Sequence, residues 1–433
     1  MNCDAKVGLQ PTRSRSTVLT AAIWAALAIG ATAANSQEAP PAYTIAPPSH
    51  PTGLKISGFG TLGYWDSTGP DDLVFRRELG QNVPKIDKNH AKADSRLGLQ
   101  LNYQASERIE LVGQLVVREH AHFRADHTIE WAFAKFRPTE DTQLRLGRVG
   151  LDMFMLSDYR NVGYAYNWVR PPTEFYGWIP FYSINGGDAV KTLALADGHL
   201  KVKVFGGKTE AGLPWQAGSY QLGARILGLG ATWENDEWRL RAYHTRLKFT
   251  DNAPFDQLIP TLQTYASIWP TGGEYADDLQ LIGQRLHYTV VGAAWESDGW
   301  QISGEFSYTH ANTTFAPQGK SAYVSIGRRF DKWVPFIGFA RNWDSAKLVL
   351  DAPPFSGLDP AAQSLRDAFD STHTDQYTAS LGVRWDVADR MAVKVQWDRS
   401  VVAINGTQLW GYGSAPWTGK AKQIWSATLD FTF

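Results

Sequence analysis

Short polar turns flanked by aromatic residues recur along this chain, and each joins two runs in which apolar and polar residues alternate. The clearest are Trp233–Trp238 (WENDEW), Trp295–Trp300 (WESDGW) and Phe330–Trp333 (FDKW). Alternation with a period of two gives a strand one apolar face and one polar face. Trp and Tyr combine an apolar ring with a polar tip, so a ring on both sides of a tight turn is typical of strands that end at a membrane–water interface.

The composition favours strands over helices as the membrane-spanning elements. The 433 residues include 18 Trp, 17 Tyr and 20 Phe, yet the mean hydropathy is −0.30. Beyond the N-terminal region no segment approaches the roughly 20 apolar residues that a spanning helix needs. An aromatic-rich chain that is hydrophilic on average is expected when lipid-facing and water-facing residues alternate.

The N-terminal region has the pattern of a secretory signal. An apolar stretch over 18–29 follows three basic residues and precedes Ala31–Ala33, which has the small-x-small form of a cleavage site. The basic residues are Lys6, Arg13 and Arg15. We therefore expect a signal peptide over 1–33, a Pro-rich leader over 34–52 and a transmembrane β-barrel over 53–433.

Removal of the signal changes what the mature chain can bind. The single cysteine, Cys3, lies in the signal, so we expect neither disulfides nor cysteine-ligated metals. The formal net charge moves only from −1 to −3, because three basic residues and Asp4 are lost together. This near-neutral balance argues against a nucleic-acid partner, and electrostatic selectivity must come from local placement of charge.

About sixteen alternating segments of roughly ten residues can be counted from Leu54 to the end of the chain. In the segment 96–103, Leu97, Leu99 and Leu101 share one face, and Gln100 lies on the other. A soluble β-sandwich also alternates, since one face of each of its sheets is dry. Alternation alone therefore leaves both folds open.

The connections distinguish the two folds, because long and short links alternate in step with the strands. Long or medium links are expected near 66–90, 120–126, 149–187, 209–221, 250–278, 311–319, 346–372 and 400–421, with short turns between them. Barrels of the outer membrane have this asymmetry. A sheet in lipid must pair every backbone donor, so a sheet of sixteen strands must close. We expect an all-β fold, a transmembrane antiparallel β-barrel of about 16 strands.

Two local patterns add detail. The last alternating segment, 424–433, ends on Phe433, which resembles the terminal signal read by the outer-membrane assembly machinery. A short helix is expected from Asp359, which can cap it, with Pro360 at the first helical position. This helix would decorate an external loop.

A barrel of this size leaves an aqueous lumen, so the feature that narrows it matters most. The loop from Leu151 to Asp188 is long and rich in aromatic residues. Such apolar groups are costly in water, so we expect this loop to fold inward against the wall. The alternative is an external loop that packs on itself or on a neighbouring subunit.

The strand end Leu144–Gly150 (LRLGRVG), the long loop after the fifth strand and the terminal Phe together resemble the general porins of Gram-negative bacteria, the 16-stranded porin family. The resemblance covers nearly all of the mature chain. It implies a homotrimer in the bacterial outer membrane that allows passive diffusion of small hydrophilic solutes and ions. Outer-membrane lipid and lipopolysaccharide would be its partners, and no enzymatic activity, cofactor or metal is implied.

In such porins acidic residues on the third long loop oppose basic residues on the wall, and the resemblance carries this pattern over by position. The acidic side would be Asp152, Asp158 and Glu174, and the basic side Arg96, Arg118, Arg145 and Arg148. A narrow pore of low dielectric focuses the field between opposed charges and favours polar solutes. The usual acidic motif Pro-Glu-Phe-Gly-Gly is absent, and Gly150–Phe154 (GLDMF) stands in its place.

Two other classes remain open. An anion-selective or phosphate-type porin would use a basic ladder, and Lys201, Lys203, Arg239 and Arg241 are expected to face inward, although acids are interspersed among them. A barrel enzyme needs a catalytic constellation at the rim. No Gly-x-Ser-x-Gly elbow, which would hold a serine nucleophile, occurs in the chain. His120, His122 and His127 lie close together in the sequence and could ligate a metal. A purely structural barrel or adhesin is also compatible with the composition.

Overall fold

The computed structural model describes residues 53–68, 75–81, 90–120, 125–215, 218–251, 255–344, 348–402 and 421–433. All of them belong to one unit, Ser49–Phe433. The expected signal peptide (1–33) and leader (34–52) lie outside the described residues.

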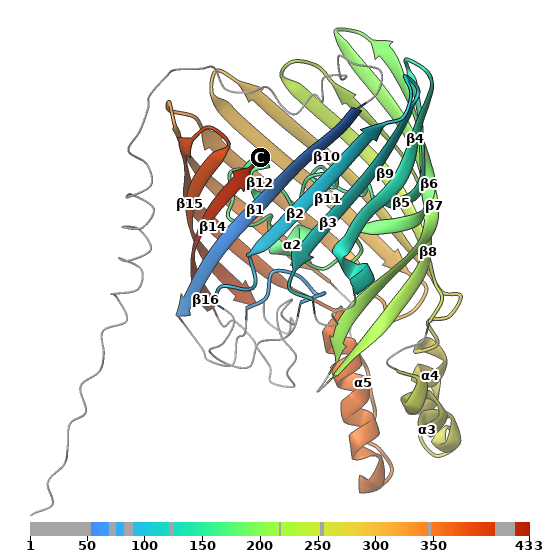
Figure 1. The fold of residues 1–433 in the computed structure, drawn as a ribbon. Coiled ribbons are helices and arrows are strands. Elements are labelled where there is room, and N and C mark those ends of the chain that lie inside the picture. Colours follow the sequence, from blue (N-terminus) through green and yellow to red (C-terminus); the bar gives the residue numbers. More distant parts are fainter. Residues whose placement is uncertain are drawn as a thin grey trace, which may run out of the picture. The chain divides into compact units, whose positions relative to one another are not determined.

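Sixteen antiparallel strands form a closed barrel, in which each strand pairs with its neighbours in sequence and β1 pairs with β16 (Figure 1). The strands are β1 (Gly53–Thr68), β2 (Arg96–Gln104), β3 (Ile109–Arg118), β4 (Ile129–Thr139), β5 (Thr142–Gly150), β6 (Ser183–Leu195), β7 (Gly198–Trp215), β8 (Gly218–Glu234), β9 (Trp238–Phe249), β10 (Arg285–Ser297), β11 (Trp300–Ala311), β12 (Gly319–Arg328), β13 (Trp333–Trp343), β14 (Gln376–Ala388), β15 (Met391–Val402) and β16 (Ala421–Thr432). The predicted fold class, strand number and closure are confirmed.

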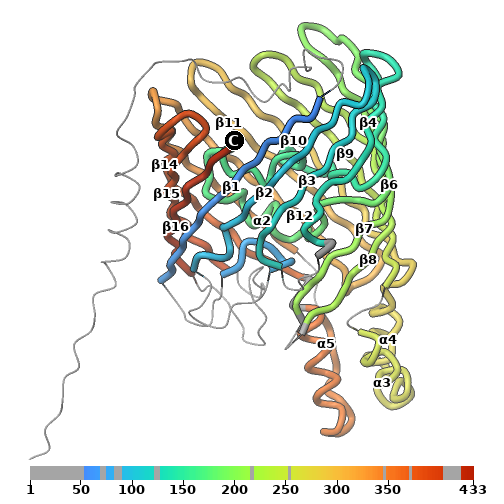
Figure 2. Tube along the Cα trace, viewed as in Figure 1, coloured from blue at the N-terminus to red at the C-terminus, as the bar shows by residue number. Residues whose placement is uncertain are grey.

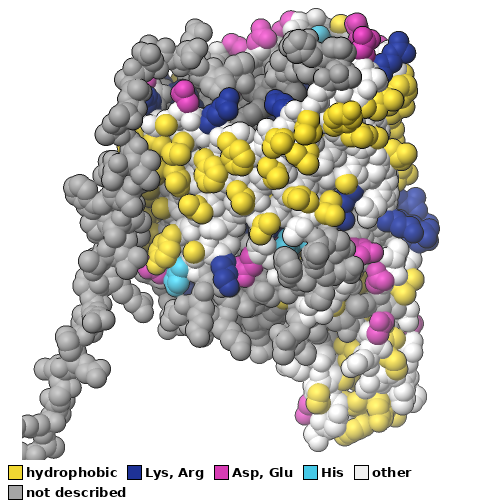
Figure 3. All heavy atoms as spheres, in the orientation of Figure 1, with side chains coloured by type: hydrophobic (Ala, Val, Ile, Leu, Met, Phe, Trp, Pro, Cys, Tyr) yellow, Lys and Arg dark blue, Asp and Glu magenta, His cyan; other side chains and the backbone are white. Residues whose placement is uncertain are grey.

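The outer face of the barrel is apolar. Leu54, Leu62 and Leu146 are 61%, 61% and 74% exposed, and hydrophobic side chains form a band around the visible face (Figure 3). At the seam between β1 and β16, the ring of Phe431 packs over Gly60 and the ring of Phe433 packs over Gly58, where a side chain would otherwise lie. The seam thus continues the apolar surface.

The inner face is polar, as the alternation predicts. In β16, Ser426, Thr428 and Asp430 point inward and are buried, whereas Trp425 is 51% exposed on the outside. Because these inward-facing polar side chains are buried, other parts of the chain must fill the lumen beside β16.

Long loops and helices lie at one end of the barrel. Helices α3 (Leu258–Tyr265), α4 (Pro270–Asp278) and α5 (Asp359–Thr372) project beyond the strands there (Figures 1 and 2). The predicted helix at 359 is confirmed, although Asp359 is its first helical residue and not its cap. None of the helices in the described residues has the length and apolar character needed to cross a membrane.

One expected connection is wrong. The link placed at 209–221 is a continuation of β7 and β8, which pair without interruption from Lys208↔Arg225 to Trp215↔Gly218. The stretch contains Gly and Pro, but alternation persists through it and buries Ala211 and Leu213. The hairpin therefore extends further than its neighbours.

Candidate functional site: the inserted loop and the lumen wall

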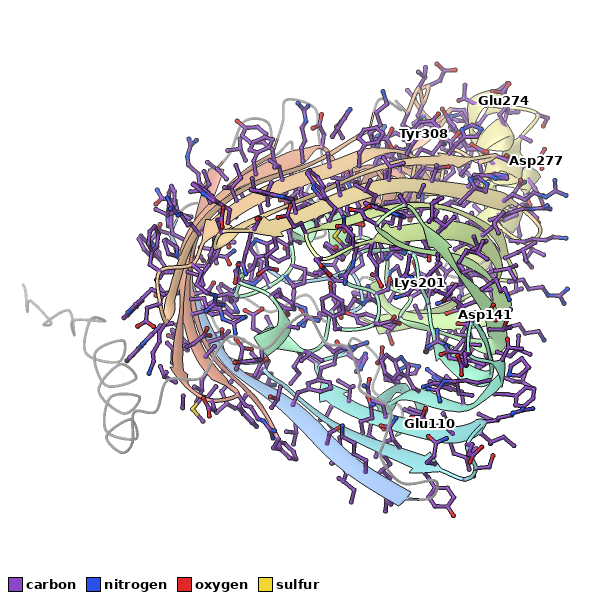
Figure 4. All side chains as sticks on the ribbon, turned by 90° about the horizontal axis from the view of Figure 1, so that it is seen from above. Glu110, Asp141, Lys201, Glu274, Asp277 and Tyr308 are labelled. Carbon is purple, nitrogen blue, oxygen red and sulfur yellow. The ribbon has the colours of Figure 1, made fainter. Side chains whose placement is uncertain are left out.

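The segment 151–182, here called the inserted loop, connects β5 to β6 and runs inside the ring of strands (Figure 4). It contains the short helix α2 (Thr173–Tyr176), and its Val169 and Phe175 are completely buried. The predicted inward folding is confirmed. The loop ends before the expected Asp188, because β6 already begins at Ser183.

Aromatic rings hold the centre of the inserted loop together. The ring of Phe154 lies 5.8 Å from Phe175, 5.1 Å from Tyr176 and 5.9 Å from Tyr288 on β10, measured between centroids. Such edge-to-face and tilted pairs stabilise beyond the area that they bury. The apolar residues that made an external loop costly therefore form a small core within the lumen.

Asp152, a predicted acidic residue of the constriction, is buried between two wall cations. Lys203 Nζ on β7 lies 2.9 Å from its Oδ2, and Arg241 Nη2 on β9 lies 2.7 Å from its Oδ1. Burial by itself would raise the pKa of Asp152, but the charges of Lys203 and Arg241 outweigh it and hold the pKa well below its ordinary value. Its partners are thus residues that the sequence assigned to a basic ladder.

Arg96 and Arg118 lie directly opposite each other on adjacent strands, and both hydrogen-bond to the inserted loop at Asn161. Arg96 donates from Nε to the Asn161 carbonyl (2.5 Å) and from Nη2 to the Tyr166 hydroxyl (2.6 Å). Arg118 donates to the Asn161 side-chain oxygen (2.9 Å) and pairs with Glu130 (3.3 Å). Both arginines act on the loop's backbone and polar side chains, not on its acids.

The remaining predicted arginines differ from each other. Arg145 makes a bidentate pair with Asp188 of β6, at 2.5 Å between Nη2 and Oδ2. Arg148 donates from Nε to the Ser183 hydroxyl (3.0 Å), and strand parity puts it on the face opposite Arg145. Asp158 is exposed, unlike the other two predicted acids, and acts electrostatically on Arg145.

Glu174 contacts a different part of the wall from these arginines. It is 1% exposed and accepts hydrogen bonds from Gln376 (2.7 Å) and Thr378 on β14. Burial raises the pKa of Glu174 to about 7, even though these hydrogen bonds favour the charged form. A cavity of about 20 Å³, lined also by Asp398, leaves room for a water molecule beside it. The structure therefore brings Asp152 and Glu174 to different walls.

Several buried ion pairs and hydrogen bonds that anchor the inserted loop were not predicted. Arg170 pairs with Asp94 (2.6 Å) and with Asp398 of β15 (3.0 Å). Lys394, fully buried, lies 3.1 Å from Asp430. Its ammonium also donates to loop carbonyls, at 2.5 Å to that of Gly163 and 2.9 Å to that of Trp168. Alternation predicts which face of a strand is polar, but no local signal shows which part of a loop reaches that face.

At Gly163 the backbone of the inserted loop lies directly against the wall. A Cβ at this position would overlap the Asp430 carboxylate and come within 2.6 Å of the Thr61 hydroxyl oxygen. Thr61 itself donates to Asp430 at 2.6 Å. Only glycine lets the backbone reach this polar cluster without displacing it.

Two groups of charged residues line the lumen toward the short turns, and all of these residues except the buried Glu110 are partly exposed. Lys201 and Arg239 flank Glu234, and Lys135 and Arg137 flank Glu110. Figure 4 labels Glu110 and Lys201 within the ring of strands. The four residues expected to form a basic ladder do face inward, but each is paired with an acid. The lumen thus offers both signs of charge.

Two of the three histidines considered as metal ligands, His120 and His127, lie among the described residues near the end of β3. The rings of His120 and His127 lie 5.7 Å apart, and His122 falls outside the described residues. Burial, together with the charge of Arg118, lowers the pKa of His120 to about 4. Across the described part of the chain, no group of three or more His, Cys, Asp or Glu residues is arranged to hold a metal ion.

Comparisons with known proteins give similarity of fold only. No family model matches the chain, and no curated protein matches it. Similar solved structures include an anion-selective porin from Comamonas acidovorans, with 11% identity, a TM-score of 0.49 and coverage of 88% of this chain and 100% of that one. OmpF of Salmonella typhi in complex with daunomycin has 13% identity, a TM-score of 0.48 and coverage of 88% and 97%. The outer membrane channel DcaP of Acinetobacter baumannii has 12% identity, a TM-score of 0.47 and coverage of 88% and 98%.

Proposed function

We propose that this chain is a porin-type channel of the bacterial outer membrane that admits small hydrophilic solutes and ions by passive diffusion. The observation that carries the proposal is a closed 16-stranded barrel whose polar lumen is narrowed by its own inserted loop. The apolar outer band suits lipid, and closure leaves no unpaired strand edge in it.

The inserted loop would act as the constriction by spanning the lumen. It is bonded to β2 and β3 through Arg96 and Arg118, to β7 and β9 through Asp152, and to β15 through Arg170. Contacts on so many sides restrict the free cross-section. We therefore expect small conductance steps and a low size limit for solutes.

Selectivity would depend on Asp158 and on the wall charges near it. Asp158 is exposed and acts electrostatically on Arg145 and Lys203. Asp152 and Glu174 are buried, so their role in this proposal is to hold the loop in place. The three acids carried over from the porin resemblance thus divide into one that meets solutes and two that position the loop.

The homotrimer and the lipid partners implied by the resemblance form part of the same proposal. Native mass spectrometry of the detergent-extracted barrel measures the subunit number directly. A protein that conducts as a monomer would contradict the proposed trimer but not the proposed channel.

Planar-bilayer recording of the purified barrel tests the proposal. Stepwise ohmic conductance, together with swelling of proteoliposomes in small sugars, is the expected result. A barrel that inserts but shows neither would favour a plugged structural barrel or adhesin, because the inserted loop would then close the lumen.

A further inference from the structure

Four cations lie side by side on the outer face of β7, β8, β9 and β10. Lys208 is paired in register with Arg225, Arg225 with Lys248, and Lys248 with Arg285. All four side chains are exposed, and strand parity points them away from the lumen. We call these four residues the cation row.

Such a row is unfavourable unless something neutralises it. Like charges directly opposite each other on neighbouring strands destabilise a sheet. No ion pair joins any of the four to a described residue, although Glu210 follows Lys208 by two positions on the same face. The arrangement is therefore suited to an anionic partner from outside the barrel.

A second line of polar groups lies next to the cation row, one step closer to the apolar band. Arg246 of β9 is in register with His287 of β10, and His287 with His310 of β11. His244 approaches His287 at 3.4 Å between ring nitrogens. The patch is therefore several strands wide and offers donors at two depths.

The cation row lies where one membrane surface would be. Trp238, at the short-turn end of β9, is ten residues from Lys248, and the exposed residues between them on the same face are Leu240 and Ala242, followed by His244 and Arg246. Ten residues of strand span about 33 Å. At a tilt of about 40° this is about 25 Å of membrane thickness, the height of the apolar band of an outer-membrane barrel. With Trp238 at one surface, the cation row reaches the other, on the side of the long loops.

We propose that the cation row binds the phosphate groups of a lipopolysaccharide molecule in the outer leaflet of the membrane. The inference rests on the outer-membrane placement proposed above. Figure 3 shows Lys and Arg side chains gathered beside the apolar band near β7 and β8. Two arginines offer paired donors that match phosphate oxygens, and the lysines add charge at the same depth. Exposed Leu227 and Leu229, below Arg225 on β8, supply an apolar surface for the acyl chains.

The binding of defined lipids to the purified barrel tests this site. Native mass spectrometry in detergent would compare lipid A carrying two phosphates with the same lipid after dephosphorylation. Each cation near an anionic surface contributes about 1 kcal/mol, or about a fivefold change in affinity. Arg225→Gln/Lys248→Gln should therefore bind bisphosphorylated lipid A about 25-fold more weakly and leave the dephosphorylated lipid unaffected.

Lys320→Gln/Arg399→Gln is the matched control. It removes two exposed outward cations near the long-loop ends of β12 and β15, where neither has a cation directly opposite. Its affinity should stay at the wild-type level. An equal loss of affinity in both double variants would show that only net charge matters and would contradict the proposed site. Equal binding of the phosphorylated and dephosphorylated lipids by the wild type would also contradict it.

Folding and function can be separated from lipid binding in the same samples. Heat-modifiable electrophoretic mobility reports the folded barrel, and removal of mutual repulsion should leave the Arg225/Lys248 variant at least as stable as the wild type without lipid. If it does not fold, the single variant Arg285→Gln, with a fivefold expected loss, replaces it. A barrel that conducts but binds phosphorylated and dephosphorylated lipid A equally well would contradict only the lipid-binding inference. One that binds the phosphates through the cation row but does not conduct overturns the channel alone.

Discussion

Replacing Glu174 by glutamine should remove most of the pH dependence of the inserted position of the loop. The carboxyl is 1% exposed and its hydrogen-bond partners, Gln376 and Thr378, are uncharged. In a displaced loop the pKa would return from about 7 to its ordinary 4.5. Between these two values the inserted loop holds a proton that the displaced loop releases. The inserted position is therefore favoured at low pH and weakened as the pH rises from about 4.5 to 7.

The size of this effect follows from the two pKa values. Each pH unit between them is worth 1.36 kcal/mol, so the inserted position loses about 3 kcal/mol across the window. The ratio of displaced to inserted loops should then rise by about two orders of magnitude between pH 4.5 and 8. In Glu174→Gln the same position is neutral at every pH, so the ratio should stay nearly constant.

Single-channel recording at pH 5, 6, 7 and 8 measures this ratio as the fraction of time spent at a larger conductance level. Asp375→Asn is the matched control, because Asp375 pairs with Arg341 outside the inserted loop and should leave the response intact. An unchanged pH response in Glu174→Gln, or a wild type with more large-conductance events in acid, would refute the reasoning.

The other predictions concern charge and packing. Asp158→Asn should shift the reversal potential in a salt gradient toward anions while changing stability by no more than about 0.5 kcal/mol, because the residue is exposed; an unshifted potential would take Asp158 out of the solute path. Asp152→Asn leaves the buried Arg241 without its carboxylate and Lys203 with Asp188 alone, so the inserted loop should be destabilised by about 3–5 kcal/mol, measured as more frequent large-conductance events. A channel as quiet as the wild type would contradict this. Gly163→Val should cost about 1–3 kcal/mol by overlap with the wall, whereas Gly53→Ala, which meets nothing within 4 Å, should be neutral in the same thermal melts.

The barrel could be predicted from sequence because its pattern is local and repeated. Each strand shows its own two faces, as in 96–103, and turn lengths alternate along the chain. Closure then follows from the need to pair every strand edge in lipid. The misplaced link at 209–221 shows the limit, because Gly and Pro suggest a turn wherever they occur, including within a long hairpin.

The site was predictable only in part, since alternation gives the face of a residue but not the part of a loop that it meets. The apolar character of the loop expected at 151–188 predicted insertion correctly. It could not show that Asp152 meets Lys203 and Arg241, or that Glu174 crosses to β14. These contacts join residues far apart in the chain, and the path of the loop across the lumen decides them.

Chemical modification of a cysteine at position 158 during recording tests the central claim most directly. The only native cysteine, Cys3, lies in the expected signal peptide, so Asp158→Cys provides a single reactive thiol. A cationic methanethiosulfonate reagent should lower the conductance of this variant in discrete steps, whereas Asp236→Cys, on an exposed short turn, should react without a change in current. Full modification of position 158 with no change in conductance would show that the inserted loop does not line the path of the ions.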